Sequence, residues 1–233
     1  MYLRDMSTLP HLVSTDAVTA LRQLCEQYPE QVVFTTSLGL EDQALTDLIA
    51  QHDLPVRLVT LDTGRLFPET YDLIDRTRSK YHNLDLVSFF PDTASLEKFV
   101  NAQGMSSIFR SIDARKTCCR IRKIDPLKRA LKGASVWVTG LRAAQSDNRA
   151  SLPRLERDGM TGLIKFNPLL DWTDAELDTY INSHGVPTNT LHRKGFPSIG
   201  CAPCTRAVLE GEHPRAGRWW WEQSSKECGL HKG

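Results

Sequence analysis

Short apolar runs alternate with amphipathic stretches along the first 142 residues of the chain. Residues 31–37, 56–64, 84–90 and 135–142 are apolar runs of strand length, which predicts buried strands. Residues 41–52, 69–81 and 92–104 follow the first three runs and show helical periodicity, with Leu45, Leu48 and Ile49 on one face of the first stretch. This order predicts an α/β fold, a twisted parallel sheet with helices on both faces.

Capping residues predict where two of the helices begin and end. Asp92 or Thr93 can cap the helix after the third strand, and Gly104 ends it. Thr173 and Glu176 have the spacing of a capping box, and Gly185 follows the apolar pattern that they open. We therefore expect a further helix between residues 173 and 185.

Polar stretches follow three of the predicted strands. They read "TSLGLEDQ", "LDTGRLFPET" and "TGLRAAQSDNR". Parallel sheets bind ligands beyond the carboxyl ends of their strands, so these stretches predict a binding site. Tight turns at Gly39 and Gly64 and a helix cap at Asp42 are structural explanations that are compatible with this role.

Composition is that of a globular protein of 233 residues, 40% hydrophobic and 24% charged. We expect one domain over residues 1–210 and a tail over residues 211–233, which is rich in glycine and basic residues. A net charge of +1 gives no general attraction to nucleic acid or a membrane, and no apolar run reaches bilayer length. The first residues lack an apolar leader, which favours a cytoplasmic location.

Four of the six cysteines have ligand-like spacing. In a reducing compartment, cysteines are more often metal ligands or catalysts than disulfides. Cys118 and Cys119 are adjacent, among many basic residues, and Cys201 and Cys204 form a CxxC pair. Adjacent thiols point apart, so they suit separate irons of a cluster better than one zinc ion. Iron–sulfur is therefore the first prediction, Cys₄ zinc the second and ordinary packing the alternative.

The remaining two cysteines differ in their surroundings. Cys228 lies near Lys226 and His231, and neighbouring cations lower a thiol pKa, so this cysteine is a candidate nucleophile. An idle tail cysteine is the alternative. Cys25, in a predicted helix, is expected to pack in the core.

Several segments together resemble one family. They are "LDTGRLFPET", "TCCRIRKIDPL", "VWVTGLRAAQS", "DWTDAELDTYI", "SIGCAPCTRAV", "AGRWWWE" and "KECGLH". They resemble the assimilatory sulfonucleotide reductases, and more narrowly the bacterial adenosine 5′-phosphosulfate (APS) reductases. The resemblance begins near residue 32 and covers nearly all of the chain after it.

The resemblance implies a fold like that of the adenine nucleotide alpha hydrolases and a role in sulfate assimilation and cysteine biosynthesis. It implies a [4Fe-4S] cluster on Cys118, Cys119, Cys201 and Cys204, and a catalytic Cys228 on a mobile C-terminal segment. It also implies phosphosulfate contacts at Lys123, Arg149, Arg215 and Arg218. The adenosine-contact candidates are Ser37, Gly39, Asp42, Leu61, Asp62, Thr63 and Gly140. ATP-cleaving relatives carry an SGGxDS loop, from which this chain departs at Leu38 or Leu40.

The chemistry implied is attack of the Cys228 thiolate on the sulfur of APS, which releases AMP and leaves an S-sulfocysteine. Thioredoxin or glutaredoxin would then release sulfite by thiol–disulfide exchange. Neither nucleic acid nor membrane is an expected partner, and a homo-oligomer is compatible with the sequence.

Three other functions are kept as alternatives. The first is the same reduction of the 3′-phosphorylated substrate (PAPS). The second is a cluster-bearing tRNA-thiolating enzyme, and the third is a regulatory module stabilised by zinc or a cluster. The "RWWWE" stretch has three possible roles, as an aromatic lid, as a thioredoxin-docking patch or as an anchor for the tail.

Overall fold

The structure is a computed structural model that describes residues 9–145 and 149–222. Cys228, the predicted nucleophile, lies outside the described residues. No helix within the described ranges is long and apolar enough to cross a bilayer.

A six-stranded sheet forms the centre of the protein, in the order β3-β2-β1-β4-β6-β5. Its strands are β1 (Val32–Thr36), β2 (Arg57–Leu61), β3 (Leu86–Phe89), β4 (Val136–Val138), β5 (Leu155–Arg157) and β6 (Ile164–Phe166). The pairs among β1, β2, β3, β4 and β6 are parallel, and β5 is antiparallel at the edge. The predicted parallel sheet is confirmed, and the structure adds β5 and β6 to it.

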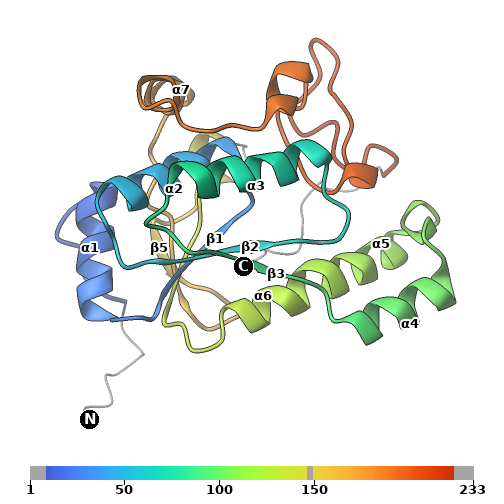
Figure 1. The fold of residues 1–233 in the computed structure, drawn as a ribbon, viewed down its shortest axis with the longest axis horizontal. Coiled ribbons are helices and arrows are strands. Elements are labelled where there is room, and N and C mark those ends of the chain that lie inside the picture. The colour runs from blue at the N-terminus through green and yellow to red at the C-terminus, as the bar shows by residue number, and fades with distance from the viewer. Residues whose placement is uncertain (1–8, 146–148, 223–233) are drawn as a thin grey trace.

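Helices cover both faces of this sheet, as expected. They are α1 (Ala17–Gln27), α2 (Leu40–Gln51), α3 (Pro68–Lys80), α4 (Thr93–Gln103), α5 (Ile112–Cys119), α6 (Asp125–Ala130) and α7 (Asp174–Ser183). Figure 1 shows α2 and α3 on one face, with α7 beyond them, and α5 and α6 on the other. The segment that follows α7 lies above the end of α3, beside the layer that α5 belongs to.

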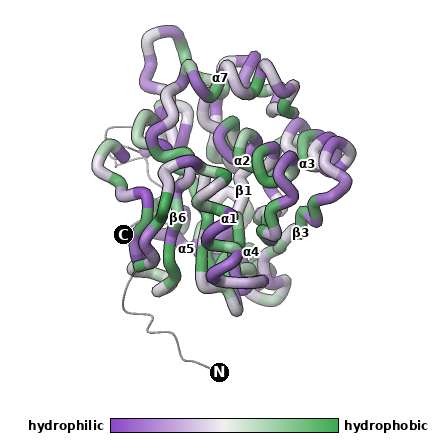
Figure 2. The backbone as a smooth tube through the Cα atoms, turned by 90° about the vertical axis from the view of Figure 1, so that its left-hand side faces the viewer, coloured by the Kyte–Doolittle hydropathy of each residue, from purple (hydrophilic) through white to green (hydrophobic). Residues whose placement is uncertain are grey.

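Residues of each strand alternate between two apolar layers, as strand geometry requires. Phe34 of β1 packs with α1 and α2 in the larger core, whereas its neighbour Val33 packs with Leu127 and Leu131 beside α6. Trp137 of β4 also belongs to the second layer. Figure 2 shows β6 as a largely hydrophobic stretch in the interior, whereas α3 and α7 alternate hydrophobic and hydrophilic residues.

The predicted helix caps are present. Asp92 caps α4 by accepting a hydrogen bond from the Ser95 amide, and Gly104 follows its last turn with φ +81°. Thr173 and Glu176 form the capping box at the start of α7. Because these bonds satisfy amides that the helix itself leaves unpaired, the two helices begin where the sequence predicts.

The order in which successive strands join the sheet reverses at β1, although β1 and β4 are parallel. Strands β1, β2 and β3 follow one another toward one edge of the sheet, and β4 then pairs with the other side of β1. This reversal creates a crevice at the carboxyl ends of β1 and β4, which is where open parallel sheets bind ligands.

Candidate active site

A cavity of about 470 Å³ opens at this crevice. It is lined by residues at the carboxyl ends of β1, β2 and β4, among them Thr36, Leu61 and Thr139. Almost all of the predicted substrate contacts line it. They are Ser37, Gly39, Asp42, Leu61, Thr63, Lys123, Gly140, Arg149, Arg215 and Arg218.

Asp62 is the predicted contact that does not line this cavity. Its Oδ1 accepts hydrogen bonds from the Gly64 amide at 2.7 Å and from the Tyr71 hydroxyl at 3.0 Å. Gly64 has φ +66°, the left-handed region in which glycine is favoured. Asp62 thus shapes the turn after β2, and its neighbour Thr63 faces the cavity.

Asp42 joins two of the loops that line the cavity. Its Oδ2 accepts hydrogen bonds from the amide of Ser37 at 2.5 Å and from the Ser37 hydroxyl at 2.7 Å. A β-carbon on Gly140 would lie 2.1 Å from the Asp42 Oδ1, so only glycine fits there. Burial raises the pKa of Asp42 to about 6, against the opposite effect of the Ser37 hydrogen bonds. Asp42 therefore holds the loop after β1 beside the loop after β4, and it also forms part of the cavity wall.

The turn between β1 and α2 has an unusual backbone. Leu38 has φ +63°, a conformation that costs a non-glycine residue about 1–2 kcal/mol. Its amide donates to the Thr36 hydroxyl at 3.0 Å, and its side chain is buried in the larger core. Gly39 has an ordinary φ of −68° and occupies the N-cap of α2. Of the two positions at which the loop departs from SGGxDS, Leu38 is therefore the one with a glycine-like conformation.

Basic side chains line the part of the cavity near the C-terminal segment. Arg218 is buried, and its Nη1 donates to the Ser198 hydroxyl and to the Ile199 carbonyl, both at 3.2 Å. A β-carbon on Gly200 would lie 2.3 Å from the Arg218 Nη2, so glycine makes room for the guanidinium. Arg149 donates a hydrogen bond to the side chain of Gln145. Such fixed guanidinium groups suit oxyanions of phosphate and sulfate type.

Arg142 is a cavity residue that the sequence analysis missed. It is buried, and its Nη2 binds Glu41 at 2.8 Å and Asp174 at 2.7 Å. Its Nη1 also donates to the Trp172 carbonyl at 2.8 Å. Arg142 thus ties the loop after β4 to the first turns of α2 and α7. Five cationic and three acidic side chains line the cavity, which favours an anionic ligand.

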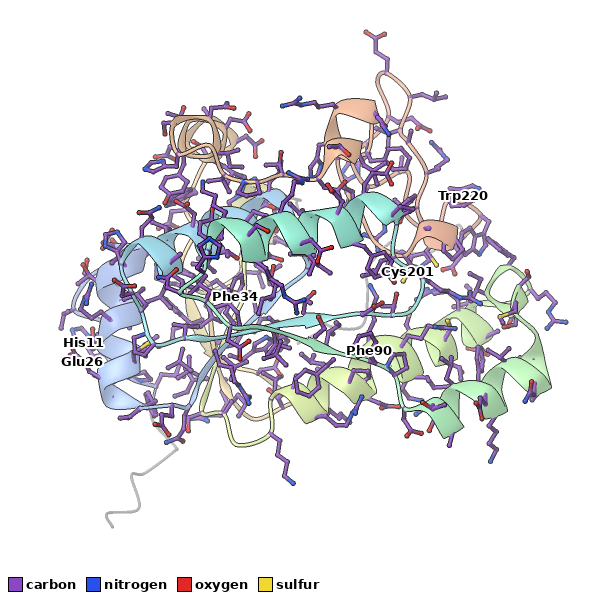
Figure 3. The ribbon with its side chains drawn as sticks, in the orientation of Figure 1. His11, Glu26, Phe34, Phe90, Cys201 and Trp220 are labelled. Carbon is purple, nitrogen blue, oxygen red and sulfur yellow. The ribbon has the colours of Figure 1, made fainter. Side chains whose placement is uncertain are left out.

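A second, smaller cavity lies beside the first and is lined by Cys118, Cys119, Cys201 and Cys204. Basic side chains surround the same space, namely Arg65, Arg115, Arg122 and Lys123. Lys123 lines both cavities, so the cysteines and the nucleotide-sized cavity share one wall. Figure 3 shows Cys201 between the C-terminal segment and the layer of α5, with Trp220 further out.

Local backbone structure places these cysteines. Cys118 and Cys119 end α5, and the helical path continues through a π-helical turn, Arg120–Ile124, into α6. π-helical turns are rare and often mark functional sites. Cys201 precedes a short 3₁₀ turn, Ala202–Cys204, and Cys204 ends it. The Ala202 amide donates a hydrogen bond to the Arg65 carbonyl at 2.8 Å. The Thr63 hydroxyl lies 3.2 Å from the Cys201 Sγ.

The surroundings of the four thiols fit a thiolate-bound group. The thiols lie among cations, and two buried N–H groups beside them, Arg122 Nε and Trp219 Nε1, have no hydrogen-bond partner within the described residues. Burial raises the pKa of Cys204 to about 12, so without a bound metal this thiol keeps its proton at neutral pH. Among residues 9–145 and 149–222, no three His, Cys, Asp or Glu side chains are arranged to hold a metal ion.

The last described residues pack against the cysteine-bearing layer. Trp219 is buried, and the guanidinium carbons of Arg115 and Arg218 lie 4.9 Å and 4.8 Å from its ring centroid. Glu222 accepts two hydrogen bonds from Arg115, at 2.9 Å and 2.7 Å.

The predicted boundary at residue 210, between one domain and a C-terminal tail, stays a prediction, as does the nucleophilic role of Cys228. Cys25 is buried in the larger core, which confirms its packing role.

Comparison with known proteins agrees with this geometry. Residues 31–207 match the model of the phosphoadenosine phosphosulfate reductase domain. An adenosine 5′-phosphosulfate reductase of Allochromatium vinosum is 49% identical over 93% of this chain and 84% of the relative. A protein of the same name from Neisseria meningitidis serogroup B is 48% identical over 85% of this chain and 81% of the relative.

Solved structures give the same result. A phosphoadenylyl-sulfate reductase from Candida auris superposes with a TM-score of 0.70 at 32% identity, over 83% of this chain and 90% of that one. An FMN adenylyltransferase from Candida glabrata, at 16% identity and a TM-score of 0.52 over 89% of this chain and 72% of that one, shares the fold alone. The chain belongs to the phosphoadenosine phosphosulfate reductase family.

Proposed function

We propose that the protein reduces APS to sulfite and AMP, using thiols as the source of electrons. The observation that carries this proposal is the position of Lys123, which lines both the cavity at the strand ends and the cavity of the four cysteines. Relatives at 48–49% identity that are named adenosine 5′-phosphosulfate reductases support the choice of substrate.

The residues of the cysteine cavity would hold a [4Fe-4S] cluster through Cys118, Cys119, Cys201 and Cys204. When bound, the cluster would supply a compact negative charge beside Lys123, the cation that also lines the substrate cavity. Lys123, Arg115 and Arg122 would offset that charge. The pair of electrons for the reduction comes from thiols, so the proposal needs no electron transfer through the metal.

The nucleoside would lie on the loops after β1, β2 and β4. Leu61 and Gly140 line the cavity and would contact the adenine, and Asp42 holds the loop that carries Ser37. Lys123, Arg149, Arg215 and Arg218 would bind the phosphosulfate. They compensate its negative charge when a thiolate approaches the sulfur.

Cys228 is the proposed nucleophile. Its thiolate attacks the sulfur of APS, the bond from sulfur to the bridging oxygen breaks, and AMP leaves with the electron pair. The product is an S-sulfocysteine. One thiolate of thioredoxin or glutaredoxin then attacks the Cys228 sulfur and releases sulfite, and the second thiol of the carrier resolves the mixed disulfide. The carrier is oxidised by two electrons and Cys228 is regenerated.

Reduction of PAPS by the same steps is the second candidate. It is supported by the phosphoadenylyl-sulfate reductase of known structure, which is 32% identical. An anaerobic assay of sulfite release with each nucleotide, in the presence of thioredoxin, tests the proposal. We expect kcat/KM to be higher with APS, and a higher value with PAPS would reverse the substrate choice.

A further inference from the structure

An apolar patch lies on the surface next to the cysteine-bearing layer. It is built around the rings of Phe109, Trp220 and Trp221, and we include Met105 and Ile112, which lie within four residues of Phe109 in the chain. Met105, Phe109, Ile112 and Trp220 are 65%, 45%, 40% and 40% exposed. The ring centroid of Phe109 lies 4.5 Å from that of Trp221 and 6.4 Å from that of Trp220. Aromatic groups gathered in this way are characteristic of protein interfaces.

Rigid structure supports this patch from below. Trp221 packs against the buried cluster that contains Ile108, Trp219 and three of the cysteines. Glu222, the next residue, is fixed by the buried ion pair with Arg115. The aromatic rings therefore have a defined position, and little side-chain entropy remains to be lost when a partner covers them.

The length of chain after Glu222 limits how far the proposed nucleophile can lie from this patch. Cys228 follows Glu222 by six residues, which can span at most about 20 Å when fully extended. A protein that attacks the sulfur of Cys228 must therefore contact this enzyme within about that distance of Glu222. The patch, which contains the two residues before Glu222, is the exposed apolar surface that the chain places within reach.

Charge around the patch indicates the character of the partner. Arg65 donates a hydrogen bond to the Met105 carbonyl at 2.7 Å, Arg110 directly follows Phe109, and Lys116 lies one turn after Ile112 in α5. Asp113 is the acidic residue within this group. Three cations against one carboxylate favour an acidic partner, because opposite charges steer the encounter.

We infer that this patch is the docking surface for the dithiol carrier protein, and the patch calls for a carrier whose thiol-bearing face is apolar with acidic residues around it. The inference rests on the proposed function, since it assigns a place to the second half of that reaction. Complexes between redox partners are transient and bury small interfaces, so a patch of five apolar residues can serve such a partner.

The test separates the two halves of the reaction. Enzyme is first incubated with APS without a carrier, and S-sulfocysteine formation is followed by intact mass. Sulfite release is then started with thioredoxin or with dithiothreitol, which needs no docking surface. The variants are Phe109→Ser and Met105→Ser, and the control is Val13→Ser. Val13 is 72% exposed and its amide donates to the side chain of Gln23 in α1, a helix that Figure 1 shows at the opposite end of the protein from α5.

We expect both patch variants to lower kcat/KM for thioredoxin about tenfold, as loss of an interface hot spot does. S-sulfocysteine formation and the rate with dithiothreitol should stay within about twofold of the parent enzyme, and Val13→Ser should behave like the parent. An unchanged rate with thioredoxin in both variants would overturn the inference.

Two other outcomes would also overturn it. Slower S-sulfocysteine formation in both variants would mean that the patch serves residues 223–233 of this chain. A change in the mass measured by light scattering would mean that it serves a second copy. If the parent enzyme forms no adduct with APS, the proposed function fails instead, so the two failures are distinguishable.

Discussion

Asp42 and Gly140 approach so closely that a β-carbon at position 140 would lie 2.1 Å from the Asp42 Oδ1. Through this contact, the first turn of α2 and the loop after β4 are held together at the wall of the cavity. The Ser37 amide and hydroxyl, which bind the other carboxylate oxygen, extend the connection to the loop after β1. The shape of the proposed nucleoside site therefore depends on one carboxylate.

Gly140→Ala should disrupt this site, since the added methyl group has no space beside Asp42. We expect the free energy of unfolding to fall by about 1–3 kcal/mol, as for other overpacked positions, and AMP affinity to fall with it. Calorimetric titration with AMP and urea unfolding measure the two effects. Gly159→Ala is the control, because a β-carbon there meets nothing within 4 Å. Equal behaviour of the two variants would show that the contact is not needed.

Asp42 should titrate near pH 6, well above an ordinary aspartate. Burial raises its pKa in the folded protein to about 6 from a usual value of 3.8, so the folded state binds the proton more tightly than the unfolded state. Its contribution to stability is thus present at about pH 4 and is lost as the pH rises through 6. Carbon-13 NMR of labelled aspartate carboxyl groups measures the pKa directly, with Asp42→Asn to identify the signal. A midpoint below pH 4 would disprove the desolvation argument.

Arg115→Met should weaken the attachment of the last described residues. It leaves the buried Glu222 carboxylate without its ion-pair partner, and such a loss costs about 3–5 kcal/mol. Hydrogen exchange at the amides of residues 218–222 and the free energy of unfolding report the effect. The double variant Arg115→Met/Glu222→Leu should recover part of the loss, because no unpaired charge remains.

A matched control for this pair is Arg206→Met, which breaks the more exposed ion pair with Glu212. Water screens that pair, so we expect a much smaller effect. If Arg115→Met and Arg206→Met destabilise the protein equally, the buried pair is not what fixes residues 218–222.

Lys123→Ala should raise the KM for APS by about tenfold or more, because a charge-assisted hydrogen bond to the phosphosulfate is lost. Lys128→Ala, five residues further on the exposed side of α6, should leave KM unchanged. Initial-rate kinetics with dithiothreitol as reductant provide the measurement. An unchanged KM in Lys123→Ala would mean that the substrate anion binds elsewhere.

The sheet and the site residues at the strand ends could be predicted because their signals are local. Strand periodicity and the capping residues of α4 and α7 depend on neighbours a few positions away, and the strand ends then bring Ser37, Leu61 and Gly140 together. The strands β5 and β6 were not predicted, because each is short and contains charged residues, whereas β4, which is equally short, lies in a continuous apolar run. Asp62 was placed in the adenosine site because it follows β2, yet its carboxylate is taken up by the adjacent turn.

Pairs far apart in the chain could not be predicted at all. Arg142 and Glu41 are 101 residues apart, and Arg115 and Glu222 are 107 residues apart. Each of these side chains resembles an ordinary surface charge in the sequence. Only the packing of the loop after β4 against α2, and of the C-terminal segment against α5, shows that these side chains are paired and that Arg142, Arg115 and Glu222 are buried.

Intact-protein mass spectrometry after incubation with APS in the absence of a carrier protein tests the proposed reaction most directly. Protein prepared without oxygen should gain the mass of one SO₃ group, the adduct should map to Cys228, and thioredoxin should remove it. Cys228→Ser should gain no mass. Preferential formation of the same adduct with PAPS would keep the chemistry and change the substrate. No adduct with either nucleotide, from folded protein prepared without oxygen, would contradict the proposed reductase mechanism.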